Sequence, residues 1–250
     1  MDRRGFLVLG AAAGAAGAAS AAAQAQLSFQ RETQSRFSYE PGVTVDEGLP
    51  VPADRLIKVA FAINPGVQVI DLAGPWEVFQ DVLLDEGAPV RRPFELYTVS
   101  ETTEPVRGSG GLTFVPDFAV DDAPAPDLLV IPHFSTREVT AIHAWIATAH
   151  QTTTLTASIC TGAFQLAKTG LLDGLPATTN QDAYDLFEER YPAVALRRGP
   201  RFVETGRFAT AGGLSAGIDL ALRVVSRCFG DRVTQETADS MEYVGQGWRV

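Results

Sequence analysis

Cys160 follows a β-branched, apolar run and precedes small residues that open a helical pattern. In Ser158-Ile159-Cys160-Thr161-Gly162, a small residue stands two positions before and two positions after the cysteine. This spacing is typical of a nucleophile elbow, a strand–turn–helix junction that only small neighbours fit. The elbow would place the sulfur at the carboxyl edge of a sheet and aim helix N–H groups at it, which favours the thiolate. We therefore predict a nucleophilic Cys160, the alternative being a small buried core residue.

Asp71 is the second candidate, in the segment VIDLAGPWEVF that spans residues 69–79. Its loop is expected to open at the same sheet edge as Cys160, where a carboxylic acid can donate or accept a proton at the sulfur. The alternative role is the N-cap of the helix that follows. Glu77 competes for the acid role, but its place on that expected helix favours a solvated or packed side chain.

Histidines could assist a thiol, and the chain has three. His133 directly follows the apolar run at 127–132, so it belongs to the same edge and is a candidate substrate-binding residue; the alternative is a loop histidine bonded to the backbone. His143 and His150 are interpreted as packing or surface residues. They are not expected to form a metal site together, because seven helical residues separate them by about 10 Å. Without a zinc spacing, a phosphate loop or a dinucleotide fingerprint, no metal or cofactor is predicted.

Backbone groups complete the predicted site. The N–H of Thr161 is the natural oxyanion donor, and its hydroxyl can bind a substrate. Gly212 and Gly213 precede another helix, where glycine permits either close backbone approach at the site or a tight turn. We include Thr161 with the catalytic residues and both glycines with the substrate-binding residues.

Strands and helices alternate from Leu56 onward. Periodicity and turn residues predict strands at 56–63, 94–100, 127–132, 152–159 and 177–179. They also predict a hairpin of 94–100 with 112–118 across Gly108–Gly111, a hairpin at 201–213, and helices at 75–87, 139–150, 163–172, 182–191, 214–229 and 231–243. The helix at 75–87 would begin at Gly74-Pro75, and Ser135–Glu138 fits a capping box. This alternation predicts an α/β fold, a mostly parallel sheet with helices on both faces. Four loops, 64–74, 132–135, 160–162 and 211–215, would meet at its carboxyl edge.

The N-terminus reads as a targeting segment. Residues 1–25 combine Arg3-Arg4, an Ala/Gly-rich stretch and a small-x-small cleavage site, which resembles a twin-arginine export signal. A membrane anchor is the alternative. Residues 26–55 are polar and rich in Pro and Gly, which predicts a flexible or surface-draped leader, and the domain would occupy 56–250. We therefore expect a periplasmic or otherwise exported protein.

Composition narrows the partners. The chain is 46% hydrophobic and has a formal net charge of −10, which disfavours nucleic acid and anionic membranes as partners after signal cleavage. A small molecule remains the expected partner. In an oxidising compartment a Cys160–Cys228 disulfide is an alternative, but the apolar helix periodicity around Cys228 predicts a buried free thiol.

Three segments resemble one superfamily: DLAGPWEVF, SICTGAFQLAKTGLLDGLPATT and TAGGLSAGIDLALRVV. Together they are similar to the ThiJ/PfpI superfamily, related to class I glutamine amidotransferases, over Ile57–Trp248. Within this superfamily, the second segment resembles the branch that contains isonitrile hydratases and the sensor domains of AraC-type regulators. The resemblance implies a flavodoxin-like three-layer sandwich, a homodimer, Cys160 as nucleophile, Asp71 as the acid and Thr161 as the residue after the cysteine.

The chain departs from the superfamily at two places. Many members continue Ala-Thr-Thr with histidine, whereas this chain has Asn180, whose amide can hydrogen-bond but cannot act as a base near neutral pH. Many also have a Gly-Gly pair where this chain has His133-Phe134. We expect Phe134 to narrow the pocket, and His133 and Asn180 to contact the substrate.

Three functions follow as hypotheses. The first is an exported hydratase or hydrolase, a lyase of the isonitrile hydratase type, in which the Cys160 thiolate adds to a small electrophilic carbon and Asp71 transfers protons. The second is a non-enzymatic redox or ligand sensor that acts through Cys160. The third is a glyoxalase-like activity on 2-oxoaldehydes. A DNA-binding regulator is disfavoured by the export signal and by the chain ending at Val250.

Overall fold

The computed structural model describes residues 24, 43–85, 90–136, 138 and 140–249. The chain divides into two units, Met1–Tyr39 and Glu40–Val250, and the architecture below belongs to the second. Apart from residue 24, the predicted signal segment and the leader up to residue 42 lie outside the described residues.

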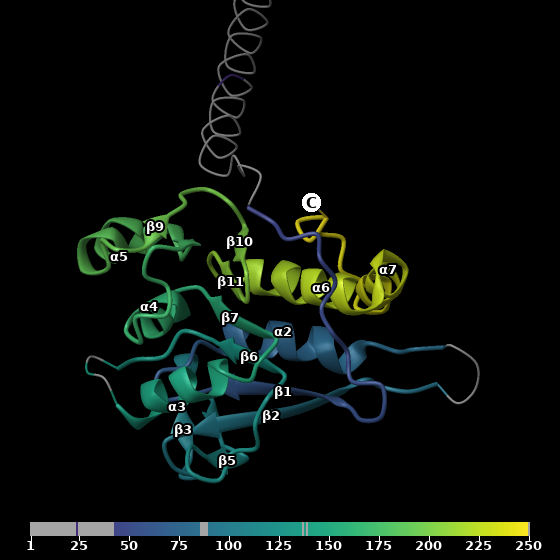
Figure 1. The fold of residues 1–250 in the computed structure, drawn as a ribbon, viewed down its shortest axis with the longest axis horizontal. Helices are drawn as coiled ribbons and strands as arrows, with labels where there is room; N and C mark the ends of the chain where they lie inside the picture. Colours follow the sequence, from purple (N-terminus) through teal and green to yellow (C-terminus); the bar gives the residue numbers. More distant parts are fainter. Residues whose placement is uncertain (1–23, 25–42, 86–89, 137, 139, 250) are drawn as a thin grey trace, which may run out of the picture. The chain divides into compact units, whose positions relative to one another are not determined.

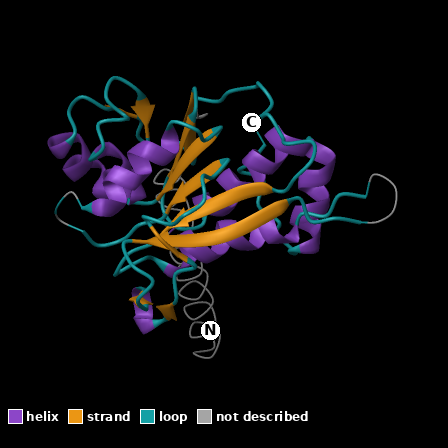
Figure 2. Cartoon of the chain, turned by 60° about the horizontal axis from the view of Figure 1, so that its bottom comes forward, coloured by secondary structure: helices purple, strands orange, loops and turns teal. Residues whose placement is uncertain are grey.

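One seven-stranded sheet forms the centre of this unit (Figures 1 and 2). Its spatial order is β10 (Phe202–Thr205), β11 (Phe208–Ala211), β7 (Leu155–Ile159), β6 (Leu128–Ile131), β1 (Ile57–Ala62), β2 (Phe94–Ser100) and β5 (Phe118–Ala119). Every neighbouring pair is parallel except β10 and β11. The central strand β6 is buried along its whole length, as its continuous apolar sequence predicts.

Helices cover both faces of the sheet, as Figure 2 shows in purple against orange. One group of packed helices comprises α2 (Val69–Asp81), α6 (Ala216–Phe229) and α7 (Asp231–Ser240). The other comprises α3 (Ala141–His150) and α4 (Gly162–Ala167), and α4 contacts β6 and β7. The predicted α/β sandwich is therefore confirmed.

Smaller elements complete the unit. The short helices are η1 (Ser109–Gly111), η2 (Gln181–Ala183) and α5 (Tyr184–Arg190), and two small sheets pair β3 (Val106–Arg107) with β4 (Thr113–Phe114) and β8 (Pro176–Ala177) with β9 (Ala195–Leu196). The predicted strand near 177–179 is thus a two-residue strand outside the central sheet. The predicted hairpin of 94–100 with 112–118 is wrong, because β2 pairs in parallel with β1 and β5, and β4 pairs with β3.

Two helix starts were predicted wrongly. Helix α2 begins at Val69, so Pro75 lies inside it and not at its start. A proline there removes the hydrogen bond to the carbonyl of Asp71, which the helix tolerates because tertiary packing holds it. Helix α3 begins at Ala141, and its capping residue is Thr140, whose backbone N–H donates to His143 Nδ1 at 3.0 Å. The Ser135–Glu138 segment therefore forms no capping box.

The described end of the leader is tied to the domain by a buried ion pair. Glu204 is fully buried and accepts hydrogen bonds from Arg223 Nε at 3.1 Å and from Arg227 Nη1 at 2.8 Å. The same carboxylate accepts from the N–H of Val45 at 3.1 Å, and the N–H of Leu49 donates to the carbonyl of Arg227 at 2.9 Å. Residues 43–49, which we call the strap, are thus draped on β10 and α6.

Both cysteines, Cys160 and Cys228, are free thiols, so the alternative disulfide is absent. Within the described ranges, no helix is long and apolar enough to cross a membrane. The same residues contain no cluster of histidine, cysteine and acidic side chains that could hold a metal ion.

Candidate active site

Cys160 occupies a strained elbow between β7 and α4. Its φ is 57°, in the left-handed region that a residue with a side chain rarely adopts. Two hydrogen bonds hold this backbone: the Cys160 N–H donates to the Gly212 carbonyl at 2.9 Å, and Thr179 Oγ1 donates to the Cys160 carbonyl at 2.9 Å. A Cβ at Gly162 would lie 2.1 Å from the Ile131 carbonyl oxygen, so only glycine permits the turn.

Asp71 lies in the first turn of α2 and is 0% exposed. The helix cap is Gln68, so the N-cap role considered for Asp71 does not apply. One carboxylate oxygen, Oδ2, accepts from the His133 N–H at 3.2 Å, while Oδ1 has no hydrogen bond of ordinary geometry with a described residue. Burial raises the pKa of Asp71 to about 7, and its contacts with the His133 N–H and the Cys160 thiol only partly oppose this rise.

The electrostatics of Cys160 differ from the sequence-based expectation. The side chain is 7% exposed, and burial, reinforced by the nearby Asp71 charge, raises the pKa of the thiol. Hydrogen bonds to the sulfur from Asn180 Nδ2, at 3.4 Å, and from the Thr161 and Leu214 N–H groups lower the pKa of the thiol. Their effect is smaller than that of burial and the Asp71 charge. The expected fall in the thiol pKa was therefore wrong, because desolvation outweighs the amide groups at the start of the six-residue helix α4.

The two groups together form a one-proton pair. Asp71 raises the pKa of Cys160 by its charge, so ionisation of both groups at once is disfavoured. With Asp71 near pKa 7 and the thiol above its usual range, the pair holds one proton over much of the range above neutrality. Such a pair can place a negative charge on sulfur and a proton on the carboxyl group without importing either from solvent.

His133 and Thr161 are joined beside this pair. His133 Nδ1 and Thr161 Oγ1 lie 2.6 Å apart, and burial lowers the pKa of His133, which favours the neutral ring. The adjacent Phe134 is fully buried, and its carbonyl accepts from Gln165 Nε2 at 2.9 Å. Phe134 is therefore a buried side chain, and it is also among the residues that line a neighbouring cavity. Its effect on the width of that pocket stays a prediction.

Asn180 reaches the sulfur because glycine makes room for it. A Cβ at Gly213 would lie 2.4 Å from Asn180 Nδ2, whereas one at Gly212 would make only ordinary contacts. The structure thus brings together all four predicted loops and adds Thr179 and Leu214, which sequence reasoning missed. The sequence did contain a signal for Thr179, because it directly precedes Asn180. In the structure Thr178 and Thr179 are both buried. Glu77 is exposed and bonded to Gln80, in agreement with its solvated interpretation.

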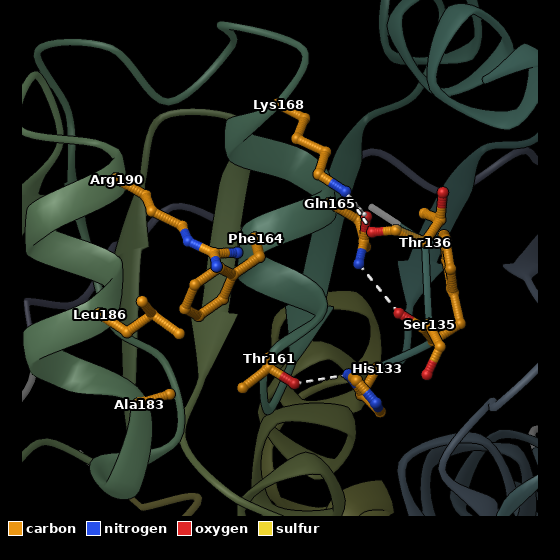
Figure 3. A pocket seen from close by; sticks show the side chains of 11 residues that line it. His133, Ser135, Thr136, Thr161, Phe164, Gln165, Lys168, Ala183, Leu186 and Arg190 are labelled. Atoms are coloured by element: carbon orange, nitrogen blue, oxygen red, sulfur yellow. Dashed lines mark hydrogen bonds between the residues drawn. The ribbon is translucent and has the colours of Figure 1, made fainter. Parts of the chain in front are cut away.

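A cavity of about 470 Å³ opens beside the elbow (Figure 3). Thr161 and His133 line one end, and residues of α4 and α5 line the walls. Its volume falls in the range of small-molecule sites. Neither Cys160 nor Asp71 lines this cavity; it adjoins the elbow through Thr161 and adjoins Asp71 through His133, whose N–H bonds to the carboxylate.

Several known proteins resemble this chain in sequence. The model of the DJ-1/PfpI family matches residues 57–227. Isonitrile hydratase from Pseudomonas putida is 29% identical over 196 residues, which cover 75% of this chain and 78% of that protein. The HTH-type transcriptional regulator GbdR from Pseudomonas aeruginosa is 28% identical over 210 residues, but this chain spans only 54% of its length.

Solved structures show the same fold. A THiJ/PfpI family protein from Pseudomonas syringae superimposes with a TM-score of 0.67 at 23% identity, covering 84% of each chain. DJ-1beta from Drosophila melanogaster gives a TM-score of 0.62 at 16% identity, covering 76% of this chain and all of that one. The chain belongs to the DJ-1/PfpI family.

Proposed function

We propose that this protein is a hydratase that adds water to a small electrophilic carbon, with isonitriles as the substrate class. The observation that carries the proposal is the isolated pair of Cys160 and Asp71, in which a fully buried carboxyl group with a pKa of about 7 interacts with a thiol on a strained elbow. A buried acid without a cationic partner is suited to proton transfer.

The proposed reaction needs only these two groups and water. Asp71 takes the thiol proton and delivers it to the terminal carbon of R–N≡C, while the Cys160 sulfur bonds to that carbon, which gives the thioimidate R–N=CH–S–Cys. The Asp71 carboxylate then takes a proton from water, whose oxygen adds to the same carbon. Asp71 returns this proton to nitrogen, which gives R–NH–CH(OH)–S–Cys. The hydroxyl then gives its proton to Asp71 as the C=O bond forms and the C–S bond breaks, which releases R–NH–CHO and leaves one proton on the Cys160–Asp71 pair. We assign binding of the added oxygen to the N–H and hydroxyl of Thr161.

The comparisons support this choice over the others. The isonitrile hydratase aligns over 78% of its own length, against 54% for the regulator. Oxidant sensing requires a thiolate that peroxide can reach. Cys160 is 7% exposed and its pKa is raised, which opposes that role.

The test is formamide production from cyclohexyl isocyanide in ¹⁸O-labelled water, followed by mass spectrometry. Wild-type protein and Cys228→Ala should give N-cyclohexylformamide with one labelled oxygen, whereas Cys160→Ala should give none above background. Lactate formation from methylglyoxal, with no formamide, would replace the hydratase proposal by the glyoxalase-like one. Oxidation of Cys160 at low peroxide, without either turnover, would favour a sensor.

We also propose export and self-association. The twin arginine and the small-x-small site in residues 1–25 support export. Replacing Arg3 and Arg4 by lysine should retain the protein in the cytoplasm on cell fractionation. The homodimer implied by the family predicts twice the chain mass in sedimentation, and a monomer would refute it.

A further inference from the structure

The cavity beside the elbow has two walls with helical periodicity. Thr161, Phe164 and Lys168 come from the start and one face of α4, and Leu186 and Arg190 come from one face of α5. Spacings of three and four residues place side chains on the same side of a helix. Figure 3 shows Lys168 and Arg190 above Thr161 in the view, with the Lys168 side chain directed toward Thr136 and the Arg190 side chain directed toward Phe164.

Two cations belong to these walls. Lys168 and Arg190 both line the cavity, and no aspartate or glutamate lines it with them. Neither forms an ion pair with a carboxylate among the residues that the structure describes. Burial lowers the pKa of Lys168, and the charge of Arg190 lowers it further. Lys168 is half-buried and Arg190 is exposed, so in a chain of net charge −10 the two form a local concentration of positive charge at the mouth of the cavity.

Lys168 is held in place by neutral acceptors. Its Nζ donates to the Thr136 carbonyl at 2.5 Å and to Gln165 Oε1 at 3.0 Å. Gln165 is itself fixed, because its Nε2 donates to the Phe134 carbonyl and its Oε1 lies 3.1 Å from His143 Nε2. An ammonium group has three N–H donors, so this arrangement orients Lys168 and leaves one donor for a ligand.

The middle of the cavity is apolar. Phe164 and Leu186 line it between Arg190 and Thr161 in the view of Figure 3, and Ala183 lines it near the Thr161 end. A molecule that fills the space would therefore meet hydrogen-bonding groups next to the reactive sulfur, a hydrocarbon wall in the middle and positive charge at the mouth.

Building on the proposed function, we propose that the cavity selects substrates with a carboxylate separated from the reactive carbon by a short hydrocarbon chain. The carboxylate lies between Lys168 and Arg190 and accepts charge-assisted hydrogen bonds from both, and the chain lies against Phe164 and Leu186. The anion relieves the repulsion between the two cations, so selectivity comes from charge as well as from shape.

Binding can be tested without turnover. Hexanoate carries the chain and the carboxylate but no electrophilic carbon, and hexanamide is its neutral counterpart. We expect the full wild-type chain to bind hexanoate about tenfold more tightly than hexanamide in calorimetric titrations at low salt. Equal affinities for the two probes would overturn the proposal.

Variants locate the anion. Arg190→Gln should reduce hexanoate affinity about tenfold and leave hexanamide unchanged, while Arg190→Lys should restore most of the difference. Arg232→Gln is the matched control, because it removes the same charge from an exposed side chain on α7 and should change neither affinity. Equal hexanoate binding by wild type and Arg190→Gln would contradict the assignment.

Kinetic measurements distinguish the proposed carboxylate-binding site from the proposed hydratase reaction. If the protein hydrates isonitriles, kcat/KM for 6-isocyanohexanoate should exceed that for its methyl ester in wild type, and the preference should disappear in Arg190→Gln. Selective hexanoate binding without turnover of either isonitrile would uphold the anion site and refute the hydratase. Turnover of both without preference would uphold the hydratase and refute the anion site.

Discussion

Asp71 and Glu204 are both fully buried carboxylates, yet their surroundings are opposite. Glu204, on β10, bonds to Arg223, Arg227 and the backbone of the strap. Asp71, at the carboxyl edge of the sheet, accepts one backbone N–H and faces a thiol. Equal burial therefore produces two different groups: Glu204 is a fixed charge that joins segments, and Asp71 is a proton carrier whose pKa is about 7.

The difference lies in what compensates the charge. Removing a carboxylate from water costs several kcal/mol unless cations and hydrogen bonds replace the water. The two arginines of α6 do so for Glu204. No described cation pairs with Asp71, so protonation is its means of compensation. Substitutions at the two positions should accordingly affect different properties.

The largest effect is expected for Asp71→Asn. The amide keeps the shape of the side chain but carries no exchangeable acid proton, so kcat/KM for an isonitrile should fall by about 10²–10⁴-fold. Stability to urea should not fall, because a neutral amide costs less to bury than a carboxylate. A variant that keeps near-normal activity would remove Asp71 from the mechanism.

Glu204→Gln should show the reverse pattern. Loss of the charge leaves Arg223 and Arg227 buried beside a neutral amide, so the free energy of unfolding should fall by about 3–5 kcal/mol in urea titrations. Activity per folded molecule should be unchanged. Glu236→Gln, at an exposed i,i+4 pair with Arg232, is the control and should cost less than about 0.5 kcal/mol. A loss of catalysis without a loss of stability would break the distinction between the two acids.

The pH dependence of kcat/KM should reflect the titration of the Cys160–Asp71 pair. Below the pKa of about 7 for Asp71, the pair carries a second proton and the sulfur loses its internal base. We expect kcat/KM to fall about tenfold between pH 6.5 and pH 5.5 and to reach a plateau above pH 8. This acid limb should vanish from the residual activity of Asp71→Asn. If the limb remains there, another group titrates.

The smallest effect is expected for Asn180→Ala. The variant removes a hydrogen bond of 3.4 Å to the sulfur, one of the contacts that lower the pKa of Cys160. In a Cys228→Ala background, alkylation of Cys160 by iodoacetamide at pH 8 should slow by about threefold to tenfold. Faster alkylation would indicate that Asn180 shields the thiol more than it activates it.

Much of this arrangement could be predicted from the sequence. The strand at 94–100 matches β2 at both ends, because an apolar run bounded by turn residues determines it. The small residues around Cys160 identified the elbow, since its steric demand is local. Asp71 was singled out from its loop before a predicted helix, and Asn180 from its departure from the superfamily pattern; the structure places both next to the sulfur.

Other features depend on distant contacts and could not be predicted. The pKa of Cys160 reflects burial by several segments, which a local helix argument ignores. The start of α3 depends on His143 acting as the reciprocal acceptor for Thr140, a role that a Glu or Gln would signal more clearly. The ion pairs of Glu204 join residues far apart in sequence, and nothing in the local pattern marks them.

The backbone of Cys160 has an evolutionary consequence. At a φ of 57°, a residue with a Cβ costs about 1–2 kcal/mol, whereas glycine adopts this conformation freely at a smaller entropic cost. Cys160→Gly should therefore be roughly 1 kcal/mol more stable than Cys160→Ala in thermal unfolding. The strained conformation is thus borne by any residue with a Cβ at this position. A lineage that loses the thiol is therefore expected to replace it by glycine more readily than by alanine.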